Sequence, residues 1–249
     1  MASTPDKLRV YADKEAVSRA AAASFAQLAQ ECINAKGRFT VALAGGSTPR
    51  LMYSMLTGPT GLAIYWEKCQ FFWGDERYVP HNDPMSNYRM AREALLDHVP
   101  VLPANIHPMP TGSGFADEDA ARYSQVLHRA LAPDGGCFDL VLLGLGTDGH
   151  TASLFPGSPA LEEQEQWVVA GPAPVEPRQR ITLTYPVLNL AKNVHFLVSG
   201  SDKVHALNCA FGRPGAVTSC PAQNVQPSNG ELIWWVDEAA AEDIATASP

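Results

Sequence analysis

Residues 39–49 read Phe-Thr-Val-Ala-Leu-Ala-Gly-Gly-Ser-Thr-Pro, and this stretch decides the fold class. The apolar beginning, residues 39–43, predicts a buried strand. The two glycines then predict a tight turn into a helix, with Ser47 or Thr48 as N-cap and Pro49 at the first helical position. A buried strand that turns directly into a helix is typical of α/β proteins.

The same alternation continues along the chain. Apolar strands are predicted at residues 70–73, 138–143, 167–170, 180–183, 194–198 and 232–236. Further helices are predicted at residues 13–36, 87–98 and 117–131. Another helix is predicted to begin after the segment 199–203 and to end at residue 210, and a short helix is predicted after residue 236. Proline- and glycine-rich loops occupy 100–116 and 212–230. The chain is therefore predicted to form a single α/β domain over residues 1–249, an open, mostly parallel Rossmann-like sheet with helices on both faces.

Composition excludes several classes of partner and location. Eighteen Lys and Arg against 26 Asp and Glu give a net charge of −8, which argues against nucleic acid and anionic membranes, because phosphates require a basic surface. Residues 1–10 lack the apolar core of a signal peptide, and no apolar run approaches the ~18 residues that span a bilayer. Five cysteines without a CxxC pair are typical of a reducing compartment, which predicts a cytoplasmic protein. The oligomeric state stays open, and a monomer is compatible with the sequence.

Polar segments follow four of the predicted strands, at residues 45–48, 74–77, 144–150 and 200–203. Ligands of open α/β sheets bind at the carboxyl ends of the strands. If the strands are parallel, all four segments lie at one edge of the sheet. Their convergence predicts a small-molecule site there.

Two of these segments predict a phosphate site. Gly45, Gly46, Ser47 and Thr48 lead into a helix N-terminus, which offers free backbone N–H groups and a partial positive charge. The alternative is an ordinary capped turn. Lys203 lies in the first turn of a predicted helix, where a cation is unfavourable unless an anion binds. Its alternative is a solvated surface lysine.

Arg77 ends the polar segment that follows the predicted strand 70–73, so it is a further candidate for holding the same phosphate. The alternative is an ion pair with Asp75 or Glu76, its neighbours in sequence.

The segment 144–149 matches the glycine pattern of dinucleotide-binding proteins, but Pro156 and Gly157 end any helix within two turns, so we exclude a nicotinamide site. The same loop holds Asp148 and His150, and a histidine there can act as a general base at neutral pH. A satisfied loop histidine is the alternative. Walker A, GxSxG, HExxH and EF-hand patterns are missing from the sequence, so general-base activation of water is the chemistry that remains.

Six segments, taken together and in order, resemble one family: Ala-Leu-Ala-Gly-Gly-Ser-Thr-Pro (42–49), Trp-Gly-Asp-Glu-Arg-Tyr-Val-Pro (73–80), Ser-Asn-Tyr (86–88), Gly-Leu-Gly-Thr-Asp-Gly-His-Thr-Ala-Ser-Leu-Phe-Pro-Gly (144–157), Arg-Ile-Thr-Leu (180–183) and Gly-Ser-Asp-Lys (200–203). Over roughly residues 39–210 the chain is similar to the glucosamine-6-phosphate isomerase/6-phosphogluconolactonase family. The resemblance implies the fold that this family shares with ribose-5-phosphate isomerase. It also implies hydrolysis of 6-phospho-glucono-1,5-lactone to 6-phosphogluconate, without metal or cofactor.

The deaminases of that family are the close alternative. They typically carry a Glu before a Pro a few residues after the loop histidine, and this Glu serves in ring opening and proton transfer. Here that position is Phe155, followed by Pro156, and a phenylalanine transfers no proton. A sugar-phosphate-sensing module without catalysis is the second alternative, and it would need a DNA-binding segment that an acidic chain lacks.

The resemblance implies a role for each polar segment. Gly45, Gly46, Ser47 and the helix start would hold the substrate phosphate together with Arg77 and Lys203, and Arg180 would reach the phosphate or the lactone oxygen. Asp75 would accept hydrogen bonds from sugar hydroxyls. His150 would take a proton from the attacking water, with Asp148 or a backbone carbonyl fixing its tautomer. Backbone N–H groups of residues 146–149, or a cation, would stabilise the oxyanion.

Overall fold

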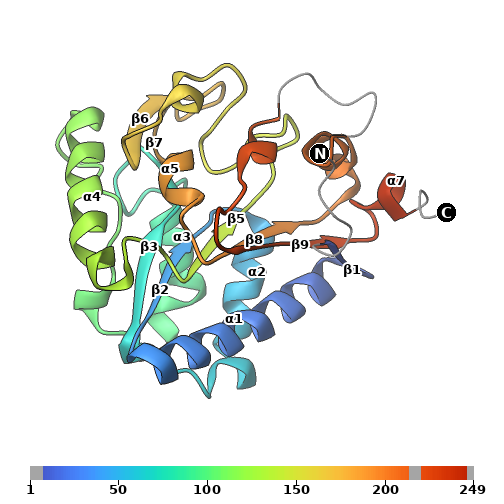
Figure 1. The fold of residues 1–249 in the computed structure, drawn as a ribbon, viewed down its shortest axis with the longest axis horizontal. Coiled ribbons are helices and arrows are strands. Elements are labelled where there is room, and N and C mark those ends of the chain that lie inside the picture. The colour runs from blue at the N-terminus through green and yellow to red at the C-terminus, as the bar shows by residue number, and fades with distance from the viewer. Residues whose placement is uncertain (1–7, 213–219, 246–249) are drawn as a thin grey trace.

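The computed structural model describes residues 8–212 and 220–245. Within them, six strands form a parallel sheet in the order β1-β9-β8-β5-β2-β3 (Figure 1). Central strands β2 and β5 are buried at every position, as their continuous apolar runs predict. The predicted mostly parallel sheet is confirmed. Its strands are β1 Leu8–Tyr11, β2 Phe39–Leu43, β3 Cys69–Trp73, β5 Leu140–Leu143, β8 Asn193–Val198 and β9 Glu231–Asp237.

Helices flank this sheet, and α1 packs against α2 and against β1, β2, β8 and β9. In Figure 1, α4 stands at the left, beside β6 and β7, while α1 crosses the lower part of the view. The described helices are α1 Lys14–Lys36, α2 Ser47–Leu56, α3 Asn87–Ala94, α4 Ala116–Leu131, α5 Tyr185–Leu188, α6 Val204–Ala210 and α7 Glu242–Ala245. Short 3-10 turns lie at Pro59–Gly61, Trp66–Lys68, Leu96–His98, Pro103–Asn105, Ala132–Asp134, Pro159–Glu162, Ser201–Lys203 and Pro221–Asn224.

A second, antiparallel sheet was not predicted. It consists of β4 (Asp75–Arg77), β7 (Gln179–Leu183) and β6 (Val168–Pro172), in that order. The sequence predicted a polar loop at 75–77, because Asp-Glu-Arg has neither apolar character nor alternation. These residues are extended because β7 pairs with them, so tertiary pairing overrides local propensity. The pairing places Arg77 directly opposite Arg180.

Several predicted boundaries need correction. The N-cap of α2 is Gly46, with φ of 103°, rather than Ser47 or Thr48. Thr48 is turned inward instead, and its hydroxyl lies 3.0 Å from that of Ser199.

Other boundaries shift by a turn or less. The predicted helix over residues 87–98 is a shorter α3 followed by a 3-10 turn, and Lys203 ends a 3-10 turn just before α6. Strand β1 escaped prediction because it is only four residues long, lies at the edge of the sheet and has no fully buried residue. Residues 213–219 of the predicted loop 212–230, and residues 1–7, lie outside the described residues.

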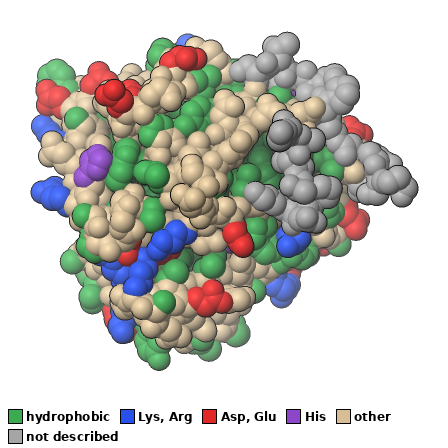
Figure 2. Space-filling view, in the orientation of Figure 1, with side chains coloured by type: hydrophobic (Ala, Val, Ile, Leu, Met, Phe, Trp, Pro, Cys, Tyr) green, Lys and Arg blue, Asp and Glu red, His purple; other side chains and the backbone are tan. Residues whose placement is uncertain are grey.

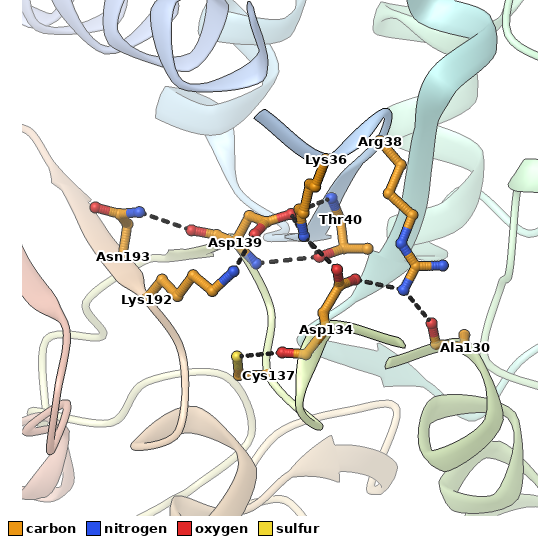
Figure 3. A network of polar contacts seen from close by, with 9 residues as sticks. All are labelled: Lys36, Arg38, Thr40, Ala130, Asp134, Cys137, Asp139, Lys192 and Asn193. Atoms are coloured by element: carbon orange, nitrogen blue, oxygen red, sulfur yellow. Dashed lines mark hydrogen bonds and ion pairs between the residues drawn. The ribbon is translucent and has the colours of Figure 1, made fainter. Parts of the chain in front are cut away.

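A buried ionic cluster joins the amino ends of the central strands, at the edge opposite the polar segments (Figure 3). The fully buried carboxylate of Asp139 accepts hydrogen bonds from the backbone N–H of Thr40 (2.9 Å) and its hydroxyl (3.0 Å). It also pairs with Lys36 at 2.7 Å and with Lys192 at 3.1 Å. Asp139 therefore connects the end of α1 with the starts of β2, β5 and β8. Nearby, Asp134 pairs with Lys36 and with Arg38.

We expect Asp139→Ala to lower the free energy of unfolding by about 3 kcal/mol, because it leaves the buried N–H and hydroxyl of Thr40 without their acceptor and removes the carboxylate that pairs with Lys36 and Lys192. Urea denaturation followed by tryptophan fluorescence measures this. Glu118→Ala is the matched control, because it removes an exposed ion pair with Arg122 (3.2 Å) and should cost less than ~1 kcal/mol. Equal losses in the two variants would show that the cluster does not stabilise the sheet.

Candidate active site

A pocket of about 250 Å³ lies at the carboxyl ends of β2, β3, β5 and β8. Residues from all four polar segments line it, so the predicted convergence at one edge is confirmed. The lining includes Gly45 and Gly46 from the first segment, Gly74, Asp75 and Arg77 from the second, Gly144, Gly146 and His150 from the third, and Lys203 from the fourth. In an open α/β sheet this is the edge at which ligands bind.

His150 and Asp148 form a hydrogen-bonded pair at the pocket wall. His150 Nδ1 lies 2.5 Å from Asp148 Oδ1, and the same oxygen accepts the backbone N–H of His150 at 3.1 Å. An Nδ1–H that donates to a carboxylate leaves Nε2 as a proton acceptor. Burial opposes ionisation of Asp148, but the hydrogen bond and charge of His150 outweigh it and hold the pKa of the carboxyl below its usual range.

Hydrogen bonds within the loop stabilise the conformation that carries this pair. Gly146 N–H donates to the carbonyl of His150 (2.8 Å), and Gly149 N–H donates to that of Gly146 (3.0 Å). The Thr151 hydroxyl donates to the carbonyl of Gly144 at 2.9 Å. A Cβ built on Gly146 would lie 2.0 Å from His150 Nδ1, so only glycine leaves room for the imidazole. The loop is thus pre-organised around the histidine.

Arg77 and Lys203 both reach the pocket. Arg77 donates to the carbonyl of Met85 at 2.8 Å. Among the described residues it forms no ion pair with Asp75 or Glu76, the alternative that the sequence had left open. Lys203 pairs with Asp202 at 3.1 Å and is only 23% exposed. Both cations are therefore placed to meet an anionic ligand.

Arg180 lies beside the pocket without lining it. It is 4% exposed and faces Arg77 across the β4–β7 pair. Burial, together with the positive charge of Arg77, lowers the pKa of the Arg180 guanidinium from its ordinary value. Arg180 thus adds positive charge behind Arg77.

The glycine turn is only partly at the pocket. Gly45 and Gly46 line it, and α2 begins immediately afterwards, so the first N–H groups of that helix have no partner within it. The side chains of Ser47 and Thr48 are elsewhere. Thr48 bonds to Ser199, and Ser47 lines a separate hollow with Lys14 and Arg50. The pocket is therefore lined by the two glycines of this turn rather than by the hydroxyl groups of Ser47 and Thr48.

Sequence reasoning missed the buried contacts that hold the second segment in place. Glu76 is fully buried, and its carboxylate accepts the backbone N–H groups of Arg77 (2.8 Å), Asn87 (2.7 Å) and Tyr88 (2.8 Å). Burial raises the pKa of Glu76 against the opposing effect of these donors. The Ser-Asn-Tyr segment at 86–88 was the available signal, but its contact with Glu76 is not readable from sequence.

Asp75 makes a second set of buried contacts that hold this segment in place. Its Oδ2 accepts the hydroxyl of Ser153 at 2.6 Å, and its Oδ1 accepts the side-chain amide of Asn87 at 3.2 Å. Asp75 thereby links the histidine loop to the start of α3.

Phe155 packs against the catalytic candidate, with its ring centroid 4.4 Å from that of His150. It is 6% exposed. At the position where the deaminase pattern has a carboxylate, this protein therefore has an apolar ring that packs against the imidazole of His150. Within the described residues, no group of three or more His, Cys, Asp or Glu is placed to hold a metal ion.

Comparison with known proteins identifies the family of this chain. The family model described as "Glucosamine-6-phosphate isomerases/6-phosphogluconolactonase" matches residues 12–234. The chain is 45% identical over 217 residues to a 6-phosphogluconolactonase of Synechocystis sp., covering 86% of this chain and 88% of that one. It is also similar to the 6-phosphogluconolactonase structure from Trypanosoma brucei, with a TM-score of 0.82, 31% identity, and coverage of 96% and 98%.

A monomeric glucosamine-6-phosphate deaminase structure aligns with a TM-score of 0.78 at 20% identity, over 95% of this chain and 99% of that one. At that identity the likeness shows the shared fold alone. Since the family model spans most of its length, the chain belongs to the glucosamine-6-phosphate isomerase/6-phosphogluconolactonase family.

Proposed function

We propose that this protein hydrolyses 6-phospho-D-glucono-1,5-lactone to 6-phospho-D-gluconate, the second step of the oxidative pentose phosphate pathway. The observation that carries the proposal is a histidine held by a carboxylate in a pocket that also contains two cations, Arg77 and Lys203. Relatives named 6-phosphogluconolactonase, at 45% and 41% identity, support it.

In this mechanism His150 Nε2 takes a proton from a water molecule, and the resulting hydroxide attacks the lactone carbonyl carbon. Asp148 keeps the proton on Nδ1 and stabilises the imidazolium that forms. Collapse of the tetrahedral intermediate breaks the ring C–O bond, and the imidazolium returns its proton to the leaving oxygen. Gly146 and Gly149 already donate their N–H groups within the loop, which favours a cation over these two amides as the oxyanion's partner.

The substrate phosphate lies, in this proposal, against Gly45, Gly46 and the start of α2, between Arg77 and Lys203. We expect Arg77→Ala and Lys203→Ala each to raise KM about 10- to 100-fold, because each removes a charge-assisted hydrogen bond worth ~1.5–3 kcal/mol. Arg129→Ala, which truncates an exposed side chain of α4, is the control and should leave KM unchanged. Unaltered KM in both pocket variants would contradict the phosphate assignment.

Deaminase activity is the competing function for this fold. Phe155 cannot transfer a proton, so we expect no ammonia from glucosamine 6-phosphate. The experiment incubates the protein with glucosamine 6-phosphate and with the lactone in parallel, and assays ammonia and lactone loss. Ammonia without lactone loss would reverse the proposal. Saturable binding of sugar phosphates without turnover of either would favour a sensing module.

We further propose that residues 1–249 act as one domain in the cytoplasm. Only Gly74 separates β3 of the first sheet from β4 of the second sheet. Its carbonyl accepts the backbone N–H of Leu183 in β7 (2.8 Å), which supports a single domain.

On the face drawn in Figure 2, Lys and Arg side chains are interspersed with Asp and Glu, which fits a small-molecule partner better than nucleic acid. No helix in the described part of the chain is long and apolar enough to cross a membrane.

A further inference from the structure

Asn87, the first residue of α3, lines the pocket and is 4% exposed. Its backbone N–H donates to Glu76, which anchors the residue at 2.7 Å. Its side-chain Nδ2 donates to the backbone oxygen of Asp75 at 3.0 Å and to the carboxylate of Asp75 at 3.2 Å. The amide nitrogen is therefore held in place by two acceptors on Asp75.

These bonds fix which way the amide points. Rotating it by 180° would set Oδ1 against two oxygen atoms of Asp75, so the network allows one orientation. Oδ1 then lies on the side of Gly45, where a Cβ built on that glycine would approach it to 2.2 Å. No described residue donates a hydrogen bond to this oxygen. The pocket thus contains a rigid acceptor that is open to a donor from water or from a ligand.

The chemistry of an amide oxygen limits that partner. It accepts hydrogen bonds and donates none, so it repels phosphate oxygens and suits a hydroxyl donor of the substrate. Arg77 and Lys203 account for the phosphate end of the substrate, and His150 for the lactone carbonyl, so the ring hydroxyls lie between them. We infer that Asn87 Oδ1 accepts a hydrogen bond from one ring hydroxyl and determines specificity for it, an inference that rests on the proposed function.

Asp75 takes a different role in consequence. The family resemblance implied that its carboxylate binds sugar hydroxyls. In the structure one carboxylate oxygen accepts from Ser153 and the other from Asn87. Asp75 is thus a positioning residue, which orients Asn87 and ties it to the loop of His150. Both carboxylate oxygens of Asp75 thus already accept a hydrogen bond, whereas Asn87 Oδ1 accepts none from the described residues.

The test compares the native lactone with three analogues that lack the hydroxyl at C2, C3 or C4. We expect the wild-type protein to lose about 10- to 100-fold in kcat/KM on one of them, because the missing donor leaves Oδ1 without a partner. We expect Asn87→Ala to lose a similar factor on the native lactone, and to hydrolyse the native lactone and that analogue at rates within about threefold of each other. Asn87→Ser provides a second, smaller truncation.

Gln125→Ala removes an exposed amide on α4 and is the control, which should keep the wild-type preference. A merely structural role for Asn87 would lower hydrolysis of all four lactones by one factor and preserve that preference, which would overturn the inference. A wild-type protein without preference among the four would overturn it without any variant. If the wild-type protein hydrolyses none of them, the proposed function itself fails and the inference falls with it.

Discussion

His150→Ala should lower kcat by about 10²–10⁴-fold while leaving KM nearly unchanged, because a general base acts on the transition state more than on binding. The imidazole is the group in the pocket with a free proton acceptor at Nε2, since Nδ1 is held by Asp148 at 2.5 Å. Initial rates of lactone loss, corrected for spontaneous hydrolysis, measure the effect. This is the largest change that the account predicts for a single side chain.

The control is His205→Ala, which removes an exposed histidine of α6. Its turnover should equal that of the wild-type protein. The folding of both variants is checked by thermal unfolding, since His150 is half-buried and its removal should leave the melting temperature close to the original. Turnover near wild type in His150→Ala would remove the histidine from the mechanism.

Gly146→Ala should be nearly as damaging, although it removes no functional group. The added Cβ would lie 2.0 Å from His150 Nδ1, 2.1 Å from His150 Cε1 and 2.7 Å from Asp148 Oδ1. The ring must therefore shift and its hydrogen bond to Asp148 must break or lengthen. A displacement of about 1 Å at a reacting group costs on the order of 10²-fold, so we expect kcat to fall by about that factor or more.

Gly112→Ala tests the same chemical change where the surrounding space is open, because nothing lies within 4 Å of its built Cβ. It should retain wild-type kcat. The double variant Gly146→Ala with His150→Ala should be no slower than His150→Ala alone, because the methyl group acts only through the imidazole. A further multiplicative loss in the double variant would show that Gly146 contributes in another way.

All strands of the main sheet except β1 were predictable, because they are largely apolar. β2 and β5 can be recognised from their own residues, without knowledge of the strands that pair with them. The turns that follow these two strands contain the glycines that shape the site. Strand β4 was not predictable. Asp75, Glu76 and Arg77 are extended only because residues a hundred positions later pair with them.

The same limit applies to the site. His150 and Asp148 are two residues apart, so their pairing could be inferred from sequence. Asn87 at the start of a helix looks like an ordinary capping residue, and its meaning depends on its contacts with Asp75 and Gly45. Thr48 shows the converse, since a hydroxyl at a helix start suggested phosphate binding but bonds to Ser199 instead.

The most direct test of the account is the rate at which 6-phosphogluconolactone disappears. The lactone is generated in situ by oxidation of glucose 6-phosphate, and its loss is followed with wild-type protein, with His150→Ala, and without protein. We predict that the wild-type protein accelerates lactone loss saturably over the spontaneous rate. After subtraction of the spontaneous rate, the rate with His150→Ala should be at least ~10²-fold lower than that with wild-type protein. Loss of the lactone at the spontaneous rate in the presence of folded wild-type protein would contradict the central claim.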